Sequence, residues 1–328
     1  MAVTTSTTVA NWLLSEAMST LALDPLRGKL VLMKLLNMSD ISGRSTKNRK
    51  IRKKTAIAAA VDDTENAAFS SPATFGVDSN ITITPTTKVQ GVQVTTDAVE
   101  LSLPGATRAS VIAAIQSNAP ESVPFIRDVM TEILEAHYLR AETDGMALFS
   151  GLSESVGTTN TTLSFATLLS ALLGVLDNNP ASEDLAFVLD EVGVSHLRAL
   201  AASGSGAALS TIFTSGAQLD FFAHRPDVSR DGSRGGFAGI PIFAGNKAIM
   251  ATANAAVDRV GALIVAGRGE TGTPGSIRGF AEMSERYAPS LGFQYDLADD
   301  TLLAVGRWCW AVGEHTDEHG NKIIYRAT

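Results

Sequence analysis

The chain has 328 residues, of which 45% are hydrophobic, 18% charged and 6% aromatic, with a formal net charge of −8 at pH 7. This composition is typical of a globular protein with one or two sizeable cores and excludes a disordered or fibrous chain. The single cysteine, Cys309, excludes an intrachain disulfide and a multi-cysteine metal site. No apolar run could span a membrane and no basic secretory start is present, so we expect a cytoplasmic product without a membrane partner.

Positive charge is concentrated near the amino end. Residues 44–54, RSTKNRKIRKK, hold seven of the 26 basic residues and no acidic one. No aromatic side chain interleaves them, so stacking on nucleic-acid bases is not expected. Three interpretations stay open: a solvated charged loop, non-specific contact with nucleic-acid phosphates, and docking on an acidic neighbouring subunit. The members of this basic cluster are Arg44, Lys47, Arg49, Lys50, Arg52, Lys53 and Lys54.

Residues 1–60 are interpreted as an N-terminal arm. A short helix is expected over 11–18 and the stretch 26–38 is strongly apolar, but Ser, Thr, Gly and the basic cluster interrupt the pattern before a core could close. The apolar face must therefore be buried on the same domain or on another copy of the chain, and both possibilities stay open.

Residues 61–104 alternate polar and apolar positions, which is typical of β-strands. Proline and glycine punctuate the segment, so we expect a β-hairpin. A Thr-rich hairpin buries little surface by itself, and we expect it to lean on a second subunit. The residues expected to make these contacts are Ile81, Ile83, Lys88, Val92 and Val94.

A short helix is expected over 106–117, and a long amphipathic helix over 121–150. Phe125, Val129 and Ile133 recur every four residues and form an apolar stripe with their neighbours Ile126, Met130, Leu134 and His137. We expect this stripe to pack against closing strands around 303–312. The other face is acidic and is expected to meet solvent or a basic partner; its residues are Asp128, Glu132, Glu135 and Glu142.

The remaining pattern predicts a compact α/β domain followed by β-strands. Helices are expected over 163–176 and 192–202, and strands over 185–189, 236–243 and 259–266. The strand 303–312 and a turn at 319–321 before a last strand, 322–325, close the chain. The fold class is therefore α+β, with a long helix, an extended β-hairpin and a compact α/β domain.

Motifs of enzyme chemistry receive little support. The stretch Gly267–Gly272 fits G-x-G-x-x-G, but Thr-Pro-Gly follows it where a dinucleotide site needs a helix N-terminus. His315 and His319 lie at a predicted turn, where they are poorly placed to share a zinc ion. No G-x-S-x-G motif is present. We expect no enzyme activity, catalytic residue, cofactor or metal; the alternative of another class is a soluble nucleotide-dependent enzyme using Gly267–Gly272.

The order of basic arm, Thr-rich hairpin, long helix, α/β domain and closing strands resembles the major capsid proteins of tailed bacteriophages, which have the HK97-like fold. Segment 87–99 resembles the returning strand of that family's extended loop, and 144–151 the end of its spine helix. Gly-Ile-Pro-Ile-Phe at 239–243 is similar to a family strand, and 307–312 to the final strand beside the spine.

This resemblance implies a shell subunit that assembles as hexamers and pentamers into an icosahedral virion capsid around double-stranded DNA, in the host cytoplasm. It implies an arm over 1–60, an extended loop over 61–104, a peripheral domain of 105–160 and 286–328 with a spine helix over 121–150, and an axial domain over 161–285. The short segment before the hairpin implies a separate scaffold or none. Portal and decoration proteins are further partners that it implies.

Two alternatives arise within the same family resemblance. Encapsulin nanocompartments are similar shells that carry protein cargo in place of a genome. Some capsid proteins also cross-link through a loop lysine and an asparagine. Lys88 lies at the base of the matching strand and no acceptor asparagine aligns, so we expect no cross-link.

Overall fold

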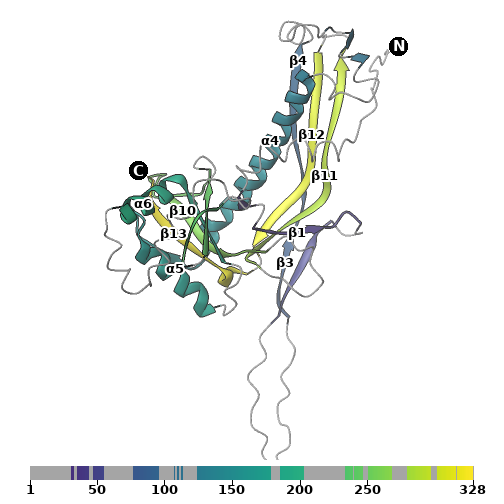
Figure 1. Ribbon diagram of the computed structural model, residues 1–328. Coiled ribbons are helices and arrows are strands. Elements are labelled where there is room, and N and C mark those ends of the chain that lie inside the picture. The colour runs from purple at the N-terminus through teal and green to yellow at the C-terminus, as the bar shows by residue number, and fades with distance from the viewer. Residues whose placement is uncertain are drawn as a thin grey trace, which may run out of the picture.

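The computed structural model describes residues 31–32, 35–43, 47–54, 77–95, 107, 109–110, 112–113, 124–178, 185–202, 233–238, 240–246, 250–267, 279–296, 301–314 and 316–327. Figure 1 shows an elongated part, in which the long helix α4 lies along a four-stranded sheet, and a compact domain around a seven-stranded sheet. A two-stranded ribbon projects from the base of the elongated part. Within the described residues, no helix is long and apolar enough to cross a membrane.

The elongated part is built on a sheet in which only the first strand pair is parallel. The register between the two longest strands shifts on both sides of Tyr287, which marks successive β-bulges. The strand order is β1 (Asn37–Asp40), β11 (Ala281–Asp296), β12 (Thr301–Glu314) and β4 (Thr86–Thr95).

Helix α4 (Pro124–Ala147), continued by the 3₁₀ turn η3 (Leu148–Gly151), covers one face of this sheet. From Val129 onward its apolar stripe is buried, with Ile133 only 1% exposed. Gly306 of β12 lies directly beneath Ile133, where there is no room for a side chain. Trp308 meets the ring of Tyr138 edge-on, with centroids 5.2 Å apart. The predicted helix and its packing against the closing strands are therefore confirmed.

The compact domain has a mixed sheet with helices on one face. Apolar residues of α5 (Phe165–Asn178) and α6 (Glu191–Ala202) share a buried cluster with that face, and the opposite face packs against η3 and the end of α4. The strand order is β5 (Ser155–Val156), β13 (Gly320–Arg326), β10 (Asp258–Val265), β6 (Leu185–Asp190), β8 (Ile240–Gly245) and β7 (Ser233–Phe237), with β9 (Thr252–Ala253) beside β10.

Strand pairing near the N-terminal end departs from the sequence prediction in two places. The ribbon consists of β2 (Arg49–Lys54) and β3 (Val77–Ile83), so part of the expected arm is a strand of the projecting loop. β4 pairs with β12, so β3 and β4 do not form the expected hairpin. Pro85 lies between them and has no N–H for a ladder, which separates the two pairings.

The last strand also lies outside its expected place. The 3₁₀ turn η5 (Asp317–His319) ends one residue before β13, which pairs with β10 of the compact domain. The expectation that all of 286–328 belongs with the long helix is therefore wrong for β13. Its buried Ile323 and Tyr325 complete the compact core. The single strand expected over 236–243 is two strands joined through Ala238, which has a φ of 52°.

Several expected features lie outside the described residues. They are the short helix over 11–18, the apolar stretch as far as 30, the alternating residues 99–103, His315 and residues 268–272 of the glycine motif.

Candidate assembly interface

The ribbon is anchored at its base on the face of the four-stranded sheet opposite α4, which we call the open face. Ile51 and Ile83 are 3% and 4% exposed. Ile83 packs over Gly313 of β12, where a Cβ would have no space. The base of the ribbon is therefore part of this chain's own core, whereas the strands lead away from it (Figure 1).

Arg49 of the basic cluster is paired within the chain. The Arg49 Nε lies 3.0 Å from the Glu282 Oε1, with the two side chains 20% and 5% exposed. Lys47 and Lys50 are exposed, which leaves the three interpretations of the cluster open. Arg44 lies outside the described residues, and Arg52, Lys53 and Lys54 continue β2.

The residues expected to contact a neighbour divide between two strands. Ile81 and Ile83 lie in β3 of the ribbon. Val92 and Val94 lie in β4 and pack against the core shared with α4, so their expected position in a projecting loop is wrong. Lys88 also lies in β4, where its ammonium is 5.1 Å from the centroid of the Trp310 ring and donates to the Thr86 Oγ1.

The predicted acidic face of α4 is exposed only toward the start of the helix. Asp128 and Glu132 are exposed and Glu135 is half-buried. Glu142 is 0% exposed, which contradicts its expected position facing solvent or a basic partner. Its position four residues after Tyr138, on the apolar stripe, is a sequence signal that its charge obscures.

The buried carboxylate of Glu142 holds the start of the described chain. Its Oε1 accepts the backbone N–H groups of Val31 at 2.8 Å and Leu32 at 2.7 Å. Leu32 packs against Gly145 one turn further along α4. A carboxylate bonded to two amides is a strong, charge-assisted anchor, so Glu142 fixes where the N-terminal segment meets the long helix.

The open face carries apolar groups above the ribbon base. In β12, Ala304, Gly306 and Trp308 are buried toward α4, and the alternate residues Leu303, Val305 and Arg307 are more exposed. Val89 of the neighbouring β4 is 58% exposed. A sheet face of this kind is a suitable surface for another protein segment.

A groove of about 650 Å³ opens beside the bulges of β11. Tyr287 lines it and is 55% exposed, with the Arg286 guanidinium 5.1 Å from its ring centroid. Glu285 and Asp40 also line the groove. Burial raises the pKa of Glu285, and the nearby Asp40 carboxylate adds to this effect.

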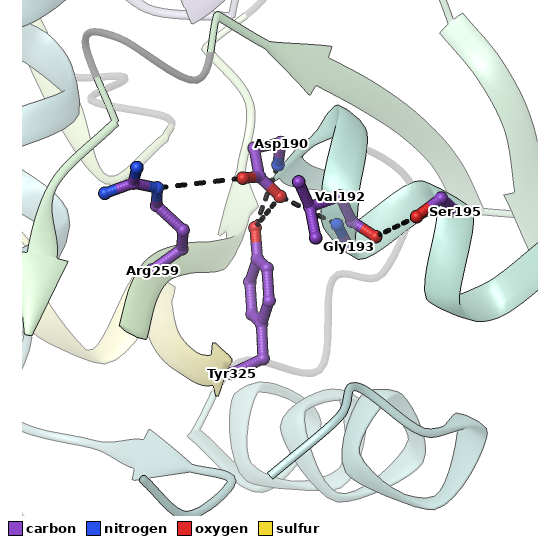
Figure 2. Close-up of polar contacts among 6 residues, drawn as sticks. All are labelled: Asp190, Val192, Gly193, Ser195, Arg259 and Tyr325. Carbon is purple, nitrogen blue, oxygen red and sulfur yellow. Dashed lines mark hydrogen bonds and ion pairs between the residues drawn. The ribbon is translucent and has the colours of Figure 1, made fainter. Parts of the chain in front are cut away.

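The compact domain contains a buried polar network (Figure 2), centred on Asp190. Its Oδ1 accepts the N–H of Gly193 at 2.7 Å, which caps α6, and the O–H of Tyr325 at 2.8 Å. The Tyr325 oxygen accepts the Asp190 N–H at 2.9 Å. The Arg259 Nε lies 3.8 Å from the Oδ2.

This network is structural. Burial raises the pKa of Tyr325 well above its ordinary value, so the phenol stays protonated and donates to Asp190. The contact ties the last strand to the start of α6. Sequence reasoning placed a strand and a helix on either side of Asp190 and missed its cap, although Asp directly before a helix is a recognised N-cap signal.

The described residues of the enzyme-like motifs make contacts within the chain. The Gly267 N–H, at the start of the glycine motif, donates to the Leu35 carbonyl at 2.7 Å. The His319 Nδ1 lies 2.9 Å from the Gly279 carbonyl. Among the residues that the structure describes, no group of three or more His, Cys, Asp or Glu could hold a metal ion.

Comparison with known proteins gives matches only at the level of structure. No protein-family model matches the chain, and no curated protein matches it. A chain of Mycobacterium phage Che8 superposes with a TM-score of 0.58 at 13% identity, over 90% of this chain and 91% of that one. The capsid of Ralstonia phage GP4 gives a TM-score of 0.58 at 7% identity, over 92% of both chains.

The chain has the HK97-like capsid fold. The SrpI encapsulin complex of Synechococcus elongatus also matches, with a TM-score of 0.52 at 13% identity, over 89% of this chain and 85% of that one. At these identities the likeness concerns the arrangement of the backbone. The HK97-like fold accounts for the occurrence of a long helix, a projecting ribbon and two separate sheets in one chain.

Proposed function

We propose that this chain is the major capsid protein of a tailed bacteriophage and self-assembles, as hexamers and pentamers, into an icosahedral shell around double-stranded DNA. The observation that carries the proposal is the HK97-like fold over about nine-tenths of both chains in solved phage capsids, including that of Ralstonia phage GP4. The protein then acts as a structural subunit without catalytic residues or cofactors. Its place is the virion capsid, assembled in the host cytoplasm.

The parts of the molecule take distinct roles in this shell. α4 is the spine helix of a peripheral domain that includes the four-stranded sheet, and the seven-stranded sheet forms the axial domain near the fivefold and sixfold axes. The ribbon of β2 and β3 is the extended loop. Its pairing supports starting the loop at the basic cluster, earlier than residue 61.

The basic cluster serves contacts between subunits and with packaged DNA. Lys47 and Lys50 are exposed at the start of the ribbon, and Asp128 and Glu132 are exposed on α4. Opposite charges on two separate surfaces suit a contact between neighbouring copies. DNA contact is to phosphates and independent of sequence. A separate scaffold, a portal and decoration proteins complete the assembly.

The proposal is tested by purifying particles from the producing host, imaging them by electron microscopy and extracting their contents. Closed particles that contain DNA are expected. Particles with protein cargo and no DNA would favour an encapsulin shell, an alternative supported by the match to the Synechococcus elongatus encapsulin. A stable monomer or dimer of the 34.3 kDa chain would contradict both shells.

The subunits are proposed to associate without covalent cross-links. The Lys88 ammonium lies over the Trp310 ring within its own sheet, which leaves it poorly placed for reaction with a neighbour. Denaturing electrophoresis of intact particles is expected to give one band at the monomer mass. A ladder of higher bands would contradict this expectation.

A further inference from the structure

His137 is a titratable side chain that lies buried where α4 packs on β12. Its side chain is only 4% exposed. Gly306 of β12 lies beneath it, and a Cβ at that glycine would come within 3.1 Å of the His137 Nε2. The rings of His137 and Trp308 meet edge to face, with centroids 6.5 Å apart. The imidazole is therefore enclosed between the helix and the strand.

The neutral form of this imidazole is the one that fits the packed interface. Within the described part of the chain, the His137 Nε2 has no hydrogen-bond partner of normal geometry. Burial lowers the pKa of His137 below its ordinary value of 6.5, and the backbone carbonyl of Gly306 offsets only part of this effect. A charge at this position has to be hydrated or paired, and the closed interface provides little of either.

The charged groups around the interface do not compensate an imidazolium in acid. Burial raises the pKa of Glu285, so falling pH removes its negative charge. Lys88 lies in register with Trp308 on the α4 side of the sheet and adds a like charge. The Arg140 guanidinium pairs with the Asp144 carboxylate. The titratable and charged residues that border the interface in the described chain are Tyr138 and Arg140 on α4, Lys88 on β4, Glu285 on β11 and Asp40 on β1.

We infer that His137 is an acid-sensitive switch whose protonation releases α4 from β12. The closed arrangement resists the proton, whereas an open arrangement exposes the imidazole to water and accepts it. Because the two arrangements differ by one bound proton, the open population rises up to about tenfold per pH unit below the ordinary histidine range. The inference concerns the single subunit and does not rest on the proposed shell.

The switch acts on the element that determines the shape of the elongated part. α4 covers one face of the four-stranded sheet, and its release uncovers Ile133 and Trp308, which are 1% and 2% exposed in the closed form. Its dependence on pH is opposite in sign to that of Glu285. The stability from a buried neutral histidine is lost as pH falls, whereas that from a buried neutral carboxyl is lost as pH rises. The two groups can therefore be separated by titration.

Hydrogen exchange of unassembled subunits at several pH values tests the switch. Protection factors, which correct for the pH dependence of intrinsic exchange, are measured by mass spectrometry for residues 129–141 of α4 and for β6. The factors of α4 are expected to fall up to about tenfold per pH unit below 6.5. Those of β6 are expected to stay level, because β6 belongs to the compact domain.

Two variants show whether His137 causes this fall. His137→Leu keeps the apolar stripe of α4 and cannot bind a proton, so its protection is expected to be independent of pH. His196→Gln removes the half-buried histidine of α6 and serves as the control, which is expected to keep the wild-type slope. An equal slope in His137→Leu and in the wild type would overturn the switch. An equal fall in β6 would show global unfolding and would also overturn the release of α4.

NMR of the histidine rings gives a direct readout on the unchanged chain. The His137 ring is expected to stay neutral as long as α4 is protected, through the pH range in which exposed histidines titrate. It is expected to become charged only together with the loss of protection in α4. A charged His137 ring in a subunit whose α4 is still fully protected would contradict the inference.

Discussion

The β-sheets of the compact domain and of the elongated part differ in how their faces are covered. The seven-stranded sheet has α5 and α6 on one face and the end of α4 with η3 on the other. The four-stranded sheet has α4 on one face, whereas its open face exposes Val89 and the groove around Tyr287. The compact domain therefore contains its own stabilising contacts, whereas we propose that neighbouring subunits cover the open face of the elongated part.

The largest expected effect is on the compact domain alone. Asp190→Ala removes the cap of α6 and leaves the buried Tyr325 hydroxyl without its acceptor, so we expect a loss of about 3 kcal/mol in the free energy of unfolding. Denaturant unfolding of unassembled subunits measures it. Ser195→Ala, an exposed position on the same helix, is the control and should change stability by less than about 0.5 kcal/mol. Equal effects of the two changes would refute the structural role of the network.

The second test disturbs the packing of α4 against the elongated sheet. Gly306→Ala places a methyl group against Ile133 and pushes α4 from β12, at an expected cost of about 1–3 kcal/mol. Gly43→Ala is the matched control, because nothing lies within 4 Å of a Cβ there. Calorimetry should show a lower melting temperature only for the Gly306 variant. Indistinguishable melting curves would mean that α4 and β12 are not in close contact.

The third test concerns the anchor of the N-terminal segment. Glu142→Ala leaves the amides of Val31 and Leu32 without their acceptor, and we expect a loss of about 2 kcal/mol. Glu142→Gln keeps a side-chain oxygen and should lose less. Hydrogen exchange of these two amides, followed by mass spectrometry, measures the anchor directly. Unchanged protection in the alanine variant would contradict it.

The same contrast explains which elements could be predicted from the sequence and which strand pairings could not. Helical periodicity predicted α4, α5 and α6, and the apolar run at 185–189 predicted β6, because these signals are local. The partners of β2, β4 and β13 were not predicted, since alternation shows that a strand exists without specifying what it pairs with. Glu142 was misplaced because its charge outweighed its position on the apolar stripe.

The fourth prediction concerns how the free energy of unfolding depends on pH through Glu285, which lines the groove. Burial raises the pKa of Glu285, so the folded chain binds this proton more tightly than the unfolded chain. Its contribution to stability is complete below the ordinary carboxyl pKa and is lost as pH rises through the raised value. Glu285→Gln should remove that decline from denaturant unfolding followed across the acidic range. If the glutamine variant loses stability with rising pH as the wild type does, another group causes the loss.

The smallest expected effect on the folded subunit comes from the exposed face of α4. Reversing Asp128 and Glu132, which are both exposed, to Lys should change the unfolding free energy by less than about 1 kcal/mol. Assembly at low salt should nevertheless weaken, because a basic partner would meet positive charge, and the difference should shrink as salt screens it. Light scattering during assembly measures both. Unaltered assembly at low salt would leave this face as a solvated surface.

The contrast between the compact domain and the elongated part is tested most directly by hydrogen exchange. The exchange is measured in unassembled subunits and in assembled particles. The account predicts that 86–94 of β4 and the ribbon strands gain strong protection on assembly, because a neighbour covers them. β6, whose six residues are all buried in the isolated chain, should be almost equally protected in both states. Protection gained mainly in β6, with β4 unchanged, would contradict the central claim that the elongated part is completed by neighbouring subunits.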